Sequence, residues 1–400
     1  MTSILIMISV QEAEHIILSR KKDFGTERVP FERSLGRVLA AGIQADRDLP
    51  ACNRATMDGI AVRQEDISHY KKLTIAGVQA AGDPPLAGTA PGECIEIMTG
   101  AALPPAFDSV VPYEDITIEN GHAMVTVTAI KKGQNVHVRA SDRKKGDMIT
   151  EGGPITPALI GIAASLGALE LEVKKWPRIA VLSSGNELVE VANTPLDWEV
   201  RRSNNQLMLS VLEKNGMAAD TFHLPDDRAV ILEQLEKCLD RYQVLLLSGG
   251  VSKGKFDHLP AVLEELEVKQ WFHRVRQKPG KPFWFGEGRA GQLVFAFPGN
   301  PVSTFLCLHR YFLPWLQASL GLEHKANYAA LDSDIAVPFP LTYFLQVSLE
   351  PRPDGMQWAR PLAGNGSGDF ANLAQAQAFM ELPAERDNFN KGEVFPIWTI

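Results

Sequence analysis

The pattern of apolar positions changes character along the chain, and each change predicts a different kind of structure. From about Val10 to Gly42 apolar residues recur at helical spacing, which predicts helix. From about Asp46 to Lys145 short β-type runs alternate with Gly and Pro turns, which predicts an antiparallel β lobe. A further helix is predicted over Ile155 to Leu169. The clearest β-type runs are Leu73-Thr74-Ile75, Cys94-Ile95-Glu96-Ile97 and Met124-Val125-Thr126-Val127.

From Arg178 onward apolar strands alternate with amphipathic helices. This alternation predicts an α/β domain with a doubly wound parallel sheet. After about Asn327 short strands and turns return, which predicts a small β domain. The predicted strands are Ile179–Leu182, Val244–Leu247 and Leu293–Phe297; the predicted helices are Asn204–Lys214, Arg228–Leu239 (capped by Asp226 or Asp227), Asp257–Leu266 and a long one from Pro301 through Leu316.

Length and composition limit the class of protein. With 400 residues, 45% of them hydrophobic and 22% charged, the chain is too long for one core, and two to four domains are expected. A net charge of −8 argues against general nucleic-acid binding. No apolar run approaches membrane-spanning length, and the apolar stretch Ile4 to Ile8 is too short for a secretion signal. We therefore expect a soluble cytoplasmic protein with reduced cysteines, which lie far apart at Cys52, Cys94, Cys238 and Cys307.

The loop from Ser248 to Asp257 is the most informative segment, because it joins a buried strand to a predicted helix. Paired glycines allow a ligand to approach the backbone, and a helix N-terminus attracts anions. Two lysines and a carboxylate in the same loop indicate a phosphorylated ligand with a metal counter-ion. Phe256 stands where a P-loop needs Ser or Thr, which excludes an ordinary NTPase. Taken alone, the loop is equally compatible with a connection that binds nothing.

Two further strand ends carry similar residues, Ser183 to Glu187 and Phe297 to Ser303. Ligands of open α/β sheets bind outside the carboxyl ends of the strands, so the three loops are expected to form one rim. Pro301 suits the first position of a helix, which leaves the Asn300 side chain as cap or ligand contact. The turn Lys278-Pro279-Gly280-Lys281-Pro282 adds two cations. The candidate carboxylates for Mg²⁺ are Glu187, Asp227 and Asp257.

A second group of polar motifs lies in the first half of the chain. Each of them, taken alone, is more simply a turn, and Asp58-Gly59 in particular is a common hairpin signal. The motifs are Thr56-Met57-Asp58-Gly59, Met98-Thr99-Gly100-Ala101, Glu114-Asp115 and Arg139 through Asp142.

Together these motifs resemble the molybdopterin molybdenumtransferase family, which comprises the MoeA proteins and the E domain of gephyrin. The resemblance covers nearly the whole chain, and it is specific because several long motifs occur in the right order. It rests on Pro50 to Ala61, Met98-Thr99-Gly100, the Ser-Gly-Gly-Val-Ser-x-Gly loop ending at Asp257, Pro279 to Pro282, Pro298 to Ser303, and Gly366-Ser367-Gly368 followed by an Ala-rich segment.

The resemblance implies an elongated subunit of four parts, usually a homodimer with its site between subunits. Adenylylated molybdopterin and molybdate are the implied substrates, AMP and molybdenum cofactor the products, and Mg²⁺ the implied metal. Contacts with an adenylyltransferase and with acceptor molybdoenzymes are also implied, and none with nucleic acid or membrane. The implied parts are an α+β linking domain (1–45 and 146–177), a β-rich lobe (46–145), the α/β molybdopterin-binding domain (178–327) and a small C-terminal β-barrel (328–400).

Roles follow by matching this chain to the family's motifs. Lys278 and Lys281 would neutralise the phosphate or pyrophosphate, and Gly249 and Gly250 would let N–H groups approach it. Neutral contacts would come from Ser252, Asn300 and Ser303, beside Pro298, and Mg²⁺ would be held by Glu187, Asp227 and Asp257. Asp58, Thr99, Asp142 and Glu187 match positions near the reacting end.

The chain departs from the family pattern at Asn186, where an Asp is common, so one carboxylate is missing. Two alternative functions stay open. The α/β domain alone also resembles the adenylyltransferase that acts before insertion, although that enzyme is typically a lone α/β domain. A non-catalytic scaffold or carrier, including a degenerate relative, is the other alternative.

Overall fold

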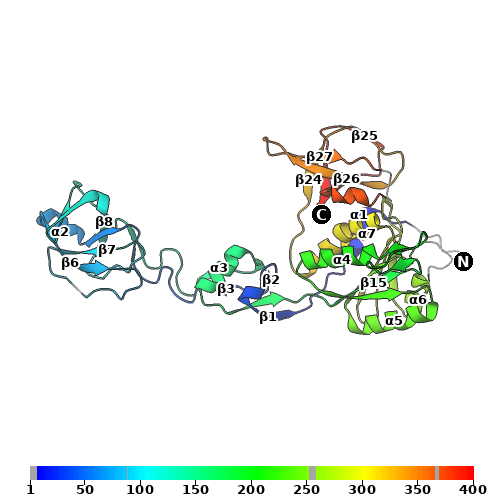
Figure 1. The fold of residues 1–400 in the computed structure, drawn as a ribbon, viewed down its shortest axis with the longest axis horizontal. Coiled ribbons are helices and arrows are strands. Elements are labelled where there is room, and N and C mark those ends of the chain that lie inside the picture. The colour runs from blue at the N-terminus through cyan, green and yellow to red at the C-terminus, as the bar shows by residue number, and fades with distance from the viewer. Residues whose placement is uncertain (1–6, 88, 252–257, 365–368) are drawn as a thin grey trace. The chain divides into compact units, whose positions relative to one another are not determined.

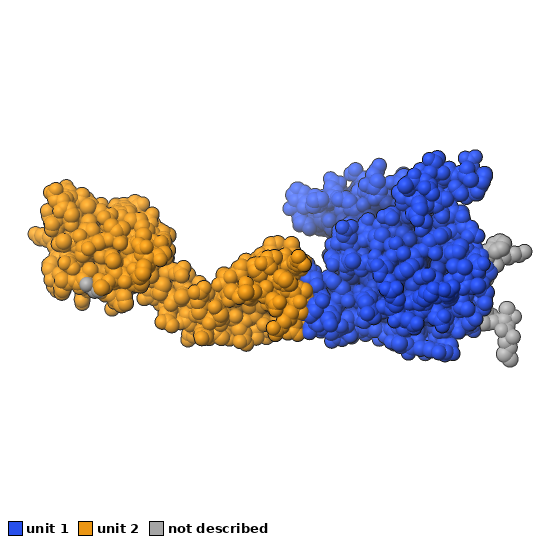
Figure 2. All heavy atoms as spheres, turned by 60° about the horizontal axis from the view of Figure 1, so that its bottom comes forward, with its two compact units in different colours: residues 1–27, 36–38, 174–400 blue, residues 28–35, 39–173 orange. Residues whose placement is uncertain are grey.

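The computed structural model describes residues 7–87, 89–251, 258–364 and 369–400. The chain forms two compact units, coloured separately in Figure 2. Unit 1 comprises residues 1–27, 36–38 and 174–400, and unit 2 comprises residues 28–35 and 39–173. The finer division into four parts stays a prediction. Within the described part of the chain, no helix has both the length and the apolarity needed to cross a bilayer.

Unit 1 contains a six-stranded sheet in the order β18-β15-β19-β23-β22-β20. The first four strands are parallel, as predicted, whereas β22 and β20 are antiparallel to their neighbours. The tight turn between Gly288 and Gln292 joins β22 to β23, and a connection that short permits only antiparallel pairing. The strands are β15 (Ile179–Ser184), β18 (Ala219–Leu224), β19 (Val244–Ser248), β20 (Lys269–His273), β22 (Trp284–Glu287) and β23 (Leu293–Phe297).

Helices cover both faces of this sheet (Figure 1), which confirms the doubly wound architecture. Successive strand residues point to opposite faces, so Val181 and Leu246 join one core while Leu182 and Leu247 join the other. Both sets are fully buried, which explains the continuous apolar runs in the sequence. The first core includes α1 (Val10–Leu18), α4 (Ser203–Lys214) and α7 (Pro301–Cys307), and the second includes α5 (Arg228–Arg241) and α6 (Leu259–Glu265).

The helix predicted from Pro301 through Leu316 reaches Ser319, but it is not uniform. Between α7 and α8 (Leu313–Ser319) the turns widen into the π-helical segment η3 (Leu308–Phe312). Pro314 has no N–H to donate to the preceding turn, and the wider turns accommodate the missing hydrogen bond.

A closed five-stranded barrel follows, which confirms the predicted C-terminal β-barrel. Its strands run in the order β26-β27-β24-β30-β28, and pairing of β28 with β26 closes it. β21 (Gln277–Lys278) pairs with the beginning of β26, so the lysine-containing turn is attached to the barrel. The strands are β24 (Asn327–Leu331), β26 (Thr342–Pro351), β27 (Gln357–Pro361), β28 (Ala378–Leu382) and β30 (Val394–Thr399).

Unit 2 is built on a six-stranded sheet in the order β8-β5-β7-β6-β10-β9. The prediction of a β-rich lobe is confirmed, but β6 and β7 are parallel in an otherwise antiparallel sheet. The connection between them, residues 80–92, is long enough to return the chain to the end of the sheet at which β6 begins, so that β7 runs in the same direction. The strands are β5 (Gly59–Val62), β6 (Leu73–Gln79), β7 (Glu93–Ile97), β8 (Ser109–Pro112), β9 (Ile116–Glu119) and β10 (His122–Val125), with the helix α2 (Gln64–His69) after β5.

The predicted helix from Val10 to Gly42 is wrong beyond Leu18. Gly25 and Gly36 adopt positive φ angles of 82° and 77°, which interrupt helix, and the chain between them forms β1 (Thr26–Pro30) and the 3-10 turn η1 (Phe31–Arg33). The helix predicted from Ile155 is shorter, α3 (Pro157–Ser165), and β14 (Glu170–Lys174) follows it. The remaining short elements are β2 (Val38–Leu39), β3 (Ile43–Gln44), β4 (Arg54–Ala55), η2 (Tyr113–Asp115), β11 (Val136–His137), β12 (Met148–Thr150), β13 (Gly153–Pro154), β16 (Leu188–Val189), β17 (Val200–Arg201), β25 (Ile335–Ala336), η4 (Ala371–Ala374) and β29 (Asn388–Phe389).

Candidate functional site

The three predicted loops of unit 1 do meet at one edge of the sheet. β15, β19 and β23 are parallel neighbours, so their carboxyl ends lie together. The Gly249 N–H donates to the Phe297 carbonyl (3.2 Å), and a side chain at Gly249 would come within 2.6 Å of the Ser184 carbonyl oxygen. Gly249 also has a φ of +90°. The close approach to Ser184 and the positive φ angle both require glycine at this position. The contacts of Gly249 with the other two loops confirm the predicted rim.

A cavity of about 330 Å³ lies beside this rim. It is formed by the lysine-containing turn and by the loop after β23. Five of the predicted cofactor-binding residues line it, namely Lys278, Lys281, Pro298, Asn300 and Ser303, together with Gln277, Pro279, Gly280, Pro282, Gly299 and Leu341. Residues far apart in the sequence are thus gathered around one space that has two cations in its wall.

The lysine-containing turn is held by Gln277, which sequence reasoning missed. Its buried amide nitrogen donates to the carbonyl oxygens of Pro279 (3.1 Å) and Gly280 (3.3 Å), and its oxygen accepts from the Tyr311 hydroxyl. Gly280 has a φ of +90°, and a side chain there would meet the Gln277 nitrogen at 2.5 Å. The Lys278 ammonium lies 4.0 Å from the centre of the Phe339 ring. The turn is therefore fixed from inside, and it carries its two lysines to the cavity.

Asn300 caps helix α7, which is one of the two roles, helix cap or ligand contact, that the sequence left open for its side chain. Its Oδ1 atom accepts from the Ser303 N–H (3.0 Å) and from the Ser303 hydroxyl (3.3 Å). Pro301 occupies the first helical turn, as predicted. Because the oxygen is used as a cap, any contact of Asn300 with a ligand falls to its amide nitrogen.

The loop after β15 is tied to the loop that precedes α5. The Asn186 N–H donates to the Asp226 carboxylate (3.2 Å), and the Asp226 N–H donates to the Asn186 side-chain oxygen (3.0 Å). Asp227, not Asp226, caps α5, because its Oδ1 accepts from the N–H groups of Ala229 (2.8 Å) and Val230 (3.1 Å). The Glu187 carboxylate folds over Gly185, where a side chain would meet it at 2.4 Å.

Ser252 and Asp257, which the sequence assigned to ligand and metal binding, lie outside the described residues, as does the rest of the segment 252–257. Among the residues that are described, no three His, Cys, Asp or Glu side chains form a group that could hold a metal ion. The three-carboxylate set Glu187, Asp227 and Asp257 therefore stays a prediction.

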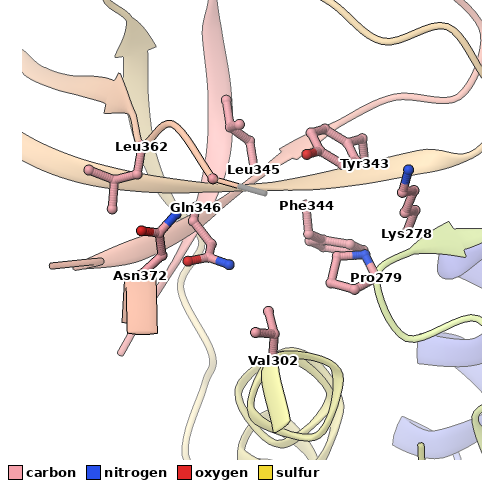
Figure 3. Close-up of a pocket in the computed structure, with 10 residues that line it drawn as sticks. Lys278, Pro279, Val302, Tyr343, Phe344, Leu345, Gln346, Leu362 and Asn372 are labelled. Atoms are coloured by element: carbon pink, nitrogen blue, oxygen red, sulfur yellow. The ribbon is translucent and has the colours of Figure 1, made fainter. Parts of the chain in front are cut away.

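A smaller cavity of about 130 Å³ adjoins the first and shares Lys278 and Pro279 with it. Figure 3 shows this space between barrel strand β26 and helix α7, which contributes Val302. The amide side chains of Gln346 and Asn372 lie on one side of it and the Tyr343 side chain on the other. The barrel thus contributes polar groups next to the lysine-containing turn.

In unit 2, Asp58 and Thr99 are in direct contact. The Asp58 Oδ1 atom accepts from the Thr99 N–H (2.6 Å) and from the Thr99 hydroxyl (2.8 Å), and these bonds, the N–H first, lower the pKa of Asp58. The hairpin interpretation of Asp58-Gly59 is wrong. Gly59 begins β5, and a side chain there would lie 2.0 Å from the Val111 carbonyl oxygen of β8. Glycine is needed for the close approach of two strands.

Asp142 joins the same region of unit 2. Its carboxylate accepts from the His137 ring (2.8 Å) and from the Ser141 hydroxyl (3.2 Å), and the His137 bond is the main cause of its lowered pKa. Backbone hydrogen bonds connect residues 53–59 with the segments that carry Thr99 and Asp142. The Gly100 N–H donates to the Ala55 carbonyl, and the Thr56 N–H donates to the Asn135 carbonyl. Glu114 and Asp115 lie in η2, which begins with Tyr113, whose N–H donates to the Asp58 carbonyl. The four motifs therefore form one neighbourhood.

Asn204 is a second residue that sequence reasoning missed. It lies in the first turn of α4, and its amide nitrogen donates to the Ser248 hydroxyl and to the Gly299 carbonyl, both at 2.8 Å. No local motif marks it, because both partners are distant in the sequence.

Fold and site together define a multidomain α/β protein with a lysine-lined cavity beside the carboxyl edge of its sheet. Family models match nearly the whole chain: MoeA N-terminal region (domain I and II) over residues 8–167, probable molybdopterin binding domain over 180–318, and MoeA C-terminal region (domain IV) over 328–400. The chain belongs to the MoeA family of molybdopterin molybdenumtransferases.

Similar proteins agree with this assignment. A molybdopterin molybdenumtransferase of Synechocystis is 39% identical over 98% of this chain and 100% of its own length. One from Synechococcus elongatus is 31% identical over 90% of this chain and 91% of its own length. A crystal structure of a molybdopterin biosynthesis MoeA protein from Pyrococcus horikoshii, at 28% identity, covers 98% of this chain and 99% of its own with a TM-score of 0.83.

Proposed function

We propose that this protein is a transferase of molybdenum cofactor biosynthesis. It takes adenylylated molybdopterin and molybdate, releases AMP and leaves molybdenum on the dithiolene. The full-length match to curated molybdenumtransferases is the observation that carries the proposal. The cavity at the sheet edge supports it, because its lining suits a phosphorylated organic ligand.

In this proposal the cavity of about 330 Å³ binds the phosphate-bearing part of the substrate. Lys278 and Lys281 neutralise its charge, since an ammonium is a compact partner for phosphate oxygens. The glycines at Gly249 and Gly250 let the substrate approach backbone N–H groups. Pro298, the Asn300 amide nitrogen and the Ser303 hydroxyl complete the contacts, and Ser252 is proposed as a further one.

We propose that Mg²⁺ is held jointly by protein and substrate. Mg²⁺ in proteins commonly has one or two carboxylate ligands plus substrate phosphate oxygens. Glu187 and Asp257 are the proposed ligands. Asp227 already uses one carboxylate oxygen as the cap of α5, so its proposed contribution is limited to the other.

Asp58, Thr99 and Asp142 are proposed to act at the reacting end of the substrate, with Glu187. Asp58 and Asp142 are exposed, and hydrogen bonds lower the pKa of both, so both stay anionic at neutral pH. Following the family resemblance, we propose a homodimer in which these residues of one subunit serve the cavity of the other. Carboxylates in both halves of the chain are consistent with that arrangement.

Cofactor transfer tests the proposal. The purified chain is mixed with adenylylated molybdopterin, molybdate and Mg²⁺, and the product is offered to a cofactor-free molybdoenzyme. We expect activation of the acceptor, strong loss of it with Lys281→Gln, and no loss with Lys325→Gln, which removes an exposed lysine outside the cavity. ATP consumption with unmodified molybdopterin would instead identify an adenylyltransferase, and tight substrate binding without turnover would identify a carrier.

Mixing two inactive variants tests the shared site. Asp58→Ala and Lys281→Gln lie in different units, so a dimer of one variant with the other would contain one intact site if units of different subunits cooperate. We expect activity to return on mixing. Absence of any return, with mixed dimers demonstrated, would contradict a site between subunits.

A further inference from the structure

Asn204 connects two of the three loops that form the rim of the cavity. Its amide nitrogen donates one hydrogen to the Ser248 hydroxyl and the other to the Gly299 carbonyl, both at 2.8 Å. Ser248 directly precedes Gly249-Gly250, and Gly299 directly precedes Asn300. One side chain therefore joins the residue before the glycine pair to the residue before the helix cap.

The orientation of this amide follows from its partners. A backbone carbonyl can only accept, so the nitrogen of Asn204 must face Gly299, and the oxygen must face the other way. That oxygen is buried, and among the described residues it has no hydrogen-bond donor. The residue as a whole is only 9% exposed. Asn204 thus provides two hydrogen bonds with its nitrogen, which is the part of the side chain that contacts the rim.

Both hydrogens of the Asn204 amide nitrogen are used to join the two loops. An apolar side chain of similar size could make neither bond, so the contribution of asparagine at this position is the connection itself. The loops are already in close contact, because a side chain on Gly299 would lie 3.7 Å from the Cα atom of Gly249. A small change in their spacing would alter the wall of the cavity, where Asn300 and Ser303 lie.

We propose that Asn204 is a positioning residue for substrate binding: it sets the spacing between the loop that begins at Ser248 and the loop that contains Gly299 and Asn300. This inference rests on the proposed function, since the substrate bound there is adenylylated molybdopterin. Asn204 is not proposed to touch the substrate. Its effect should therefore appear in the affinity for substrate, and only weakly in the rate at saturation.

The variants Asn204→Asp and Ser248→Ala test the connection that Asn204 makes between Ser248 and Gly299. Asp is close to isosteric with Asn, but its carboxylate cannot donate to the Gly299 carbonyl. Ser248→Ala keeps that bond and removes only the other. The matched control is Asn215→Ala, which removes a side-chain-to-backbone bond (2.8 Å, to Val211) at the opposite end of the same helix.

In steady-state AMP release, we expect Asn204→Asp to raise KM for adenylylated molybdopterin at least tenfold, with kcat changed less than threefold. Ser248→Ala should raise KM by a smaller factor, and Asn215→Ala should leave KM unchanged. A purely structural role would instead lower the fraction of active enzyme, hence kcat, in both asparagine variants. Wild-type KM in Asn204→Asp, or an equal rise in Asn215→Ala, would overturn the inference.

Hydrogen exchange provides a readout that does not depend on turnover. Amide exchange at residues 249–251 and 298–303 should accelerate in Asn204→Asp but not in Asn215→Ala. Unchanged exchange at both loops would overturn the inference even if the wild type is active. An inactive wild type with accelerated loop exchange in Asn204→Asp would instead contradict the proposed function while supporting the role of Asn204 in setting the loop spacing.

Discussion

Gly280→Ala probes the lysine-containing turn with a single methyl group. Gly280 separates the Pro279 and Lys281 positions of the cavity wall and has a φ of +90°. The added Cβ would lie 2.5 Å from the Gln277 amide nitrogen and 3.1 Å from the Cys307 sulfur, both in the buried interior. Alanine therefore introduces backbone strain and a steric clash together.

The two contributions can be estimated separately. A left-handed backbone costs a residue with a side chain about 1–2 kcal/mol. Displacing Gln277 breaks its bonds to the Pro279 and Gly280 carbonyls, each with a net value of about 0.5–1.5 kcal/mol. The total predicted loss in the free energy of unfolding is about 2–5 kcal/mol.

Gly321→Ala is the matched control, because Gly321 has a φ of +80° and no atom within 4 Å of the added Cβ. It should lose only the backbone part, about 1–2 kcal/mol. All seven tryptophans lie in unit 1, as do both glycines, so tryptophan fluorescence during urea unfolding reports on the relevant unit. The affinity for adenylylated molybdopterin should fall in Gly280→Ala alone.

Equal destabilisation by the two substitutions would contradict this prediction, because it would mean that the Gln277 contact contributes nothing to stability. The double variant Gln277→Ala/Gly280→Ala provides a second check. Removing the side chain that the methyl group strikes should make the combined loss smaller than the sum of the single losses.

Three further predictions concern other contacts. Arg310 is buried and pairs with two carboxylates, each at 2.9 Å, of which Glu381 is the more buried and Glu14 the more exposed. Glu381→Ala removes the buried partner, so thermal denaturation should show a loss of up to about 3–5 kcal/mol, against about 1 kcal/mol or less for Glu14→Ala. Thr99→Val removes the hydroxyl bond that helps to lower the pKa of Asp58, so the pKa of Asp58 should rise toward its usual range in an NMR titration. Because the wild-type pKa is lowered, any stabilisation by this carboxylate is present above its unfolded-state pKa and is lost as pH falls through the folded-state pKa. The stability of the variant should therefore depend less on acid pH. A chelator should abolish AMP release reversibly, with Mg²⁺ restoring it and the circular dichroism unchanged throughout; persistent activity would contradict the proposed metal.

The sequence predicts the α/β sheet and its rim well, for a physical reason. Strands buried on both faces are mostly apolar, so β23 is an unbroken apolar run, and β15 and β19 are apolar up to the serines at their carboxyl ends. The carboxyl ends of neighbouring parallel strands share one edge of the sheet, so the meeting of the loops that follow them can be predicted before any distance is known.

Features that depend on contacts distant in the sequence are not predictable in this way. Gln277 and Asn204 are ordinary polar residues in the sequence, and their roles arise because folding brings carbonyl groups of other loops to them. The parallel pairing of β6 with β7 likewise depends on the path of residues 80–92. The prediction of helix beyond Leu18 is wrong because it relied on apolar spacing alone. Helix α1 ends at Leu18, and the positive φ angles of Gly25 and Gly36 are incompatible with helix further along the chain.

The most direct test of the central claim is the stoichiometry of a single turnover. Adenylylated molybdopterin is mixed with an excess of the wild-type protein and Mg²⁺, with and without molybdate, and AMP and dithiolene-bound molybdenum are measured in the same sample. We expect equal amounts of the two products, with no cofactor formed when molybdate is withheld. AMP released in full with no molybdenum bound to the dithiolene would contradict the assignment of this chain as a molybdenumtransferase.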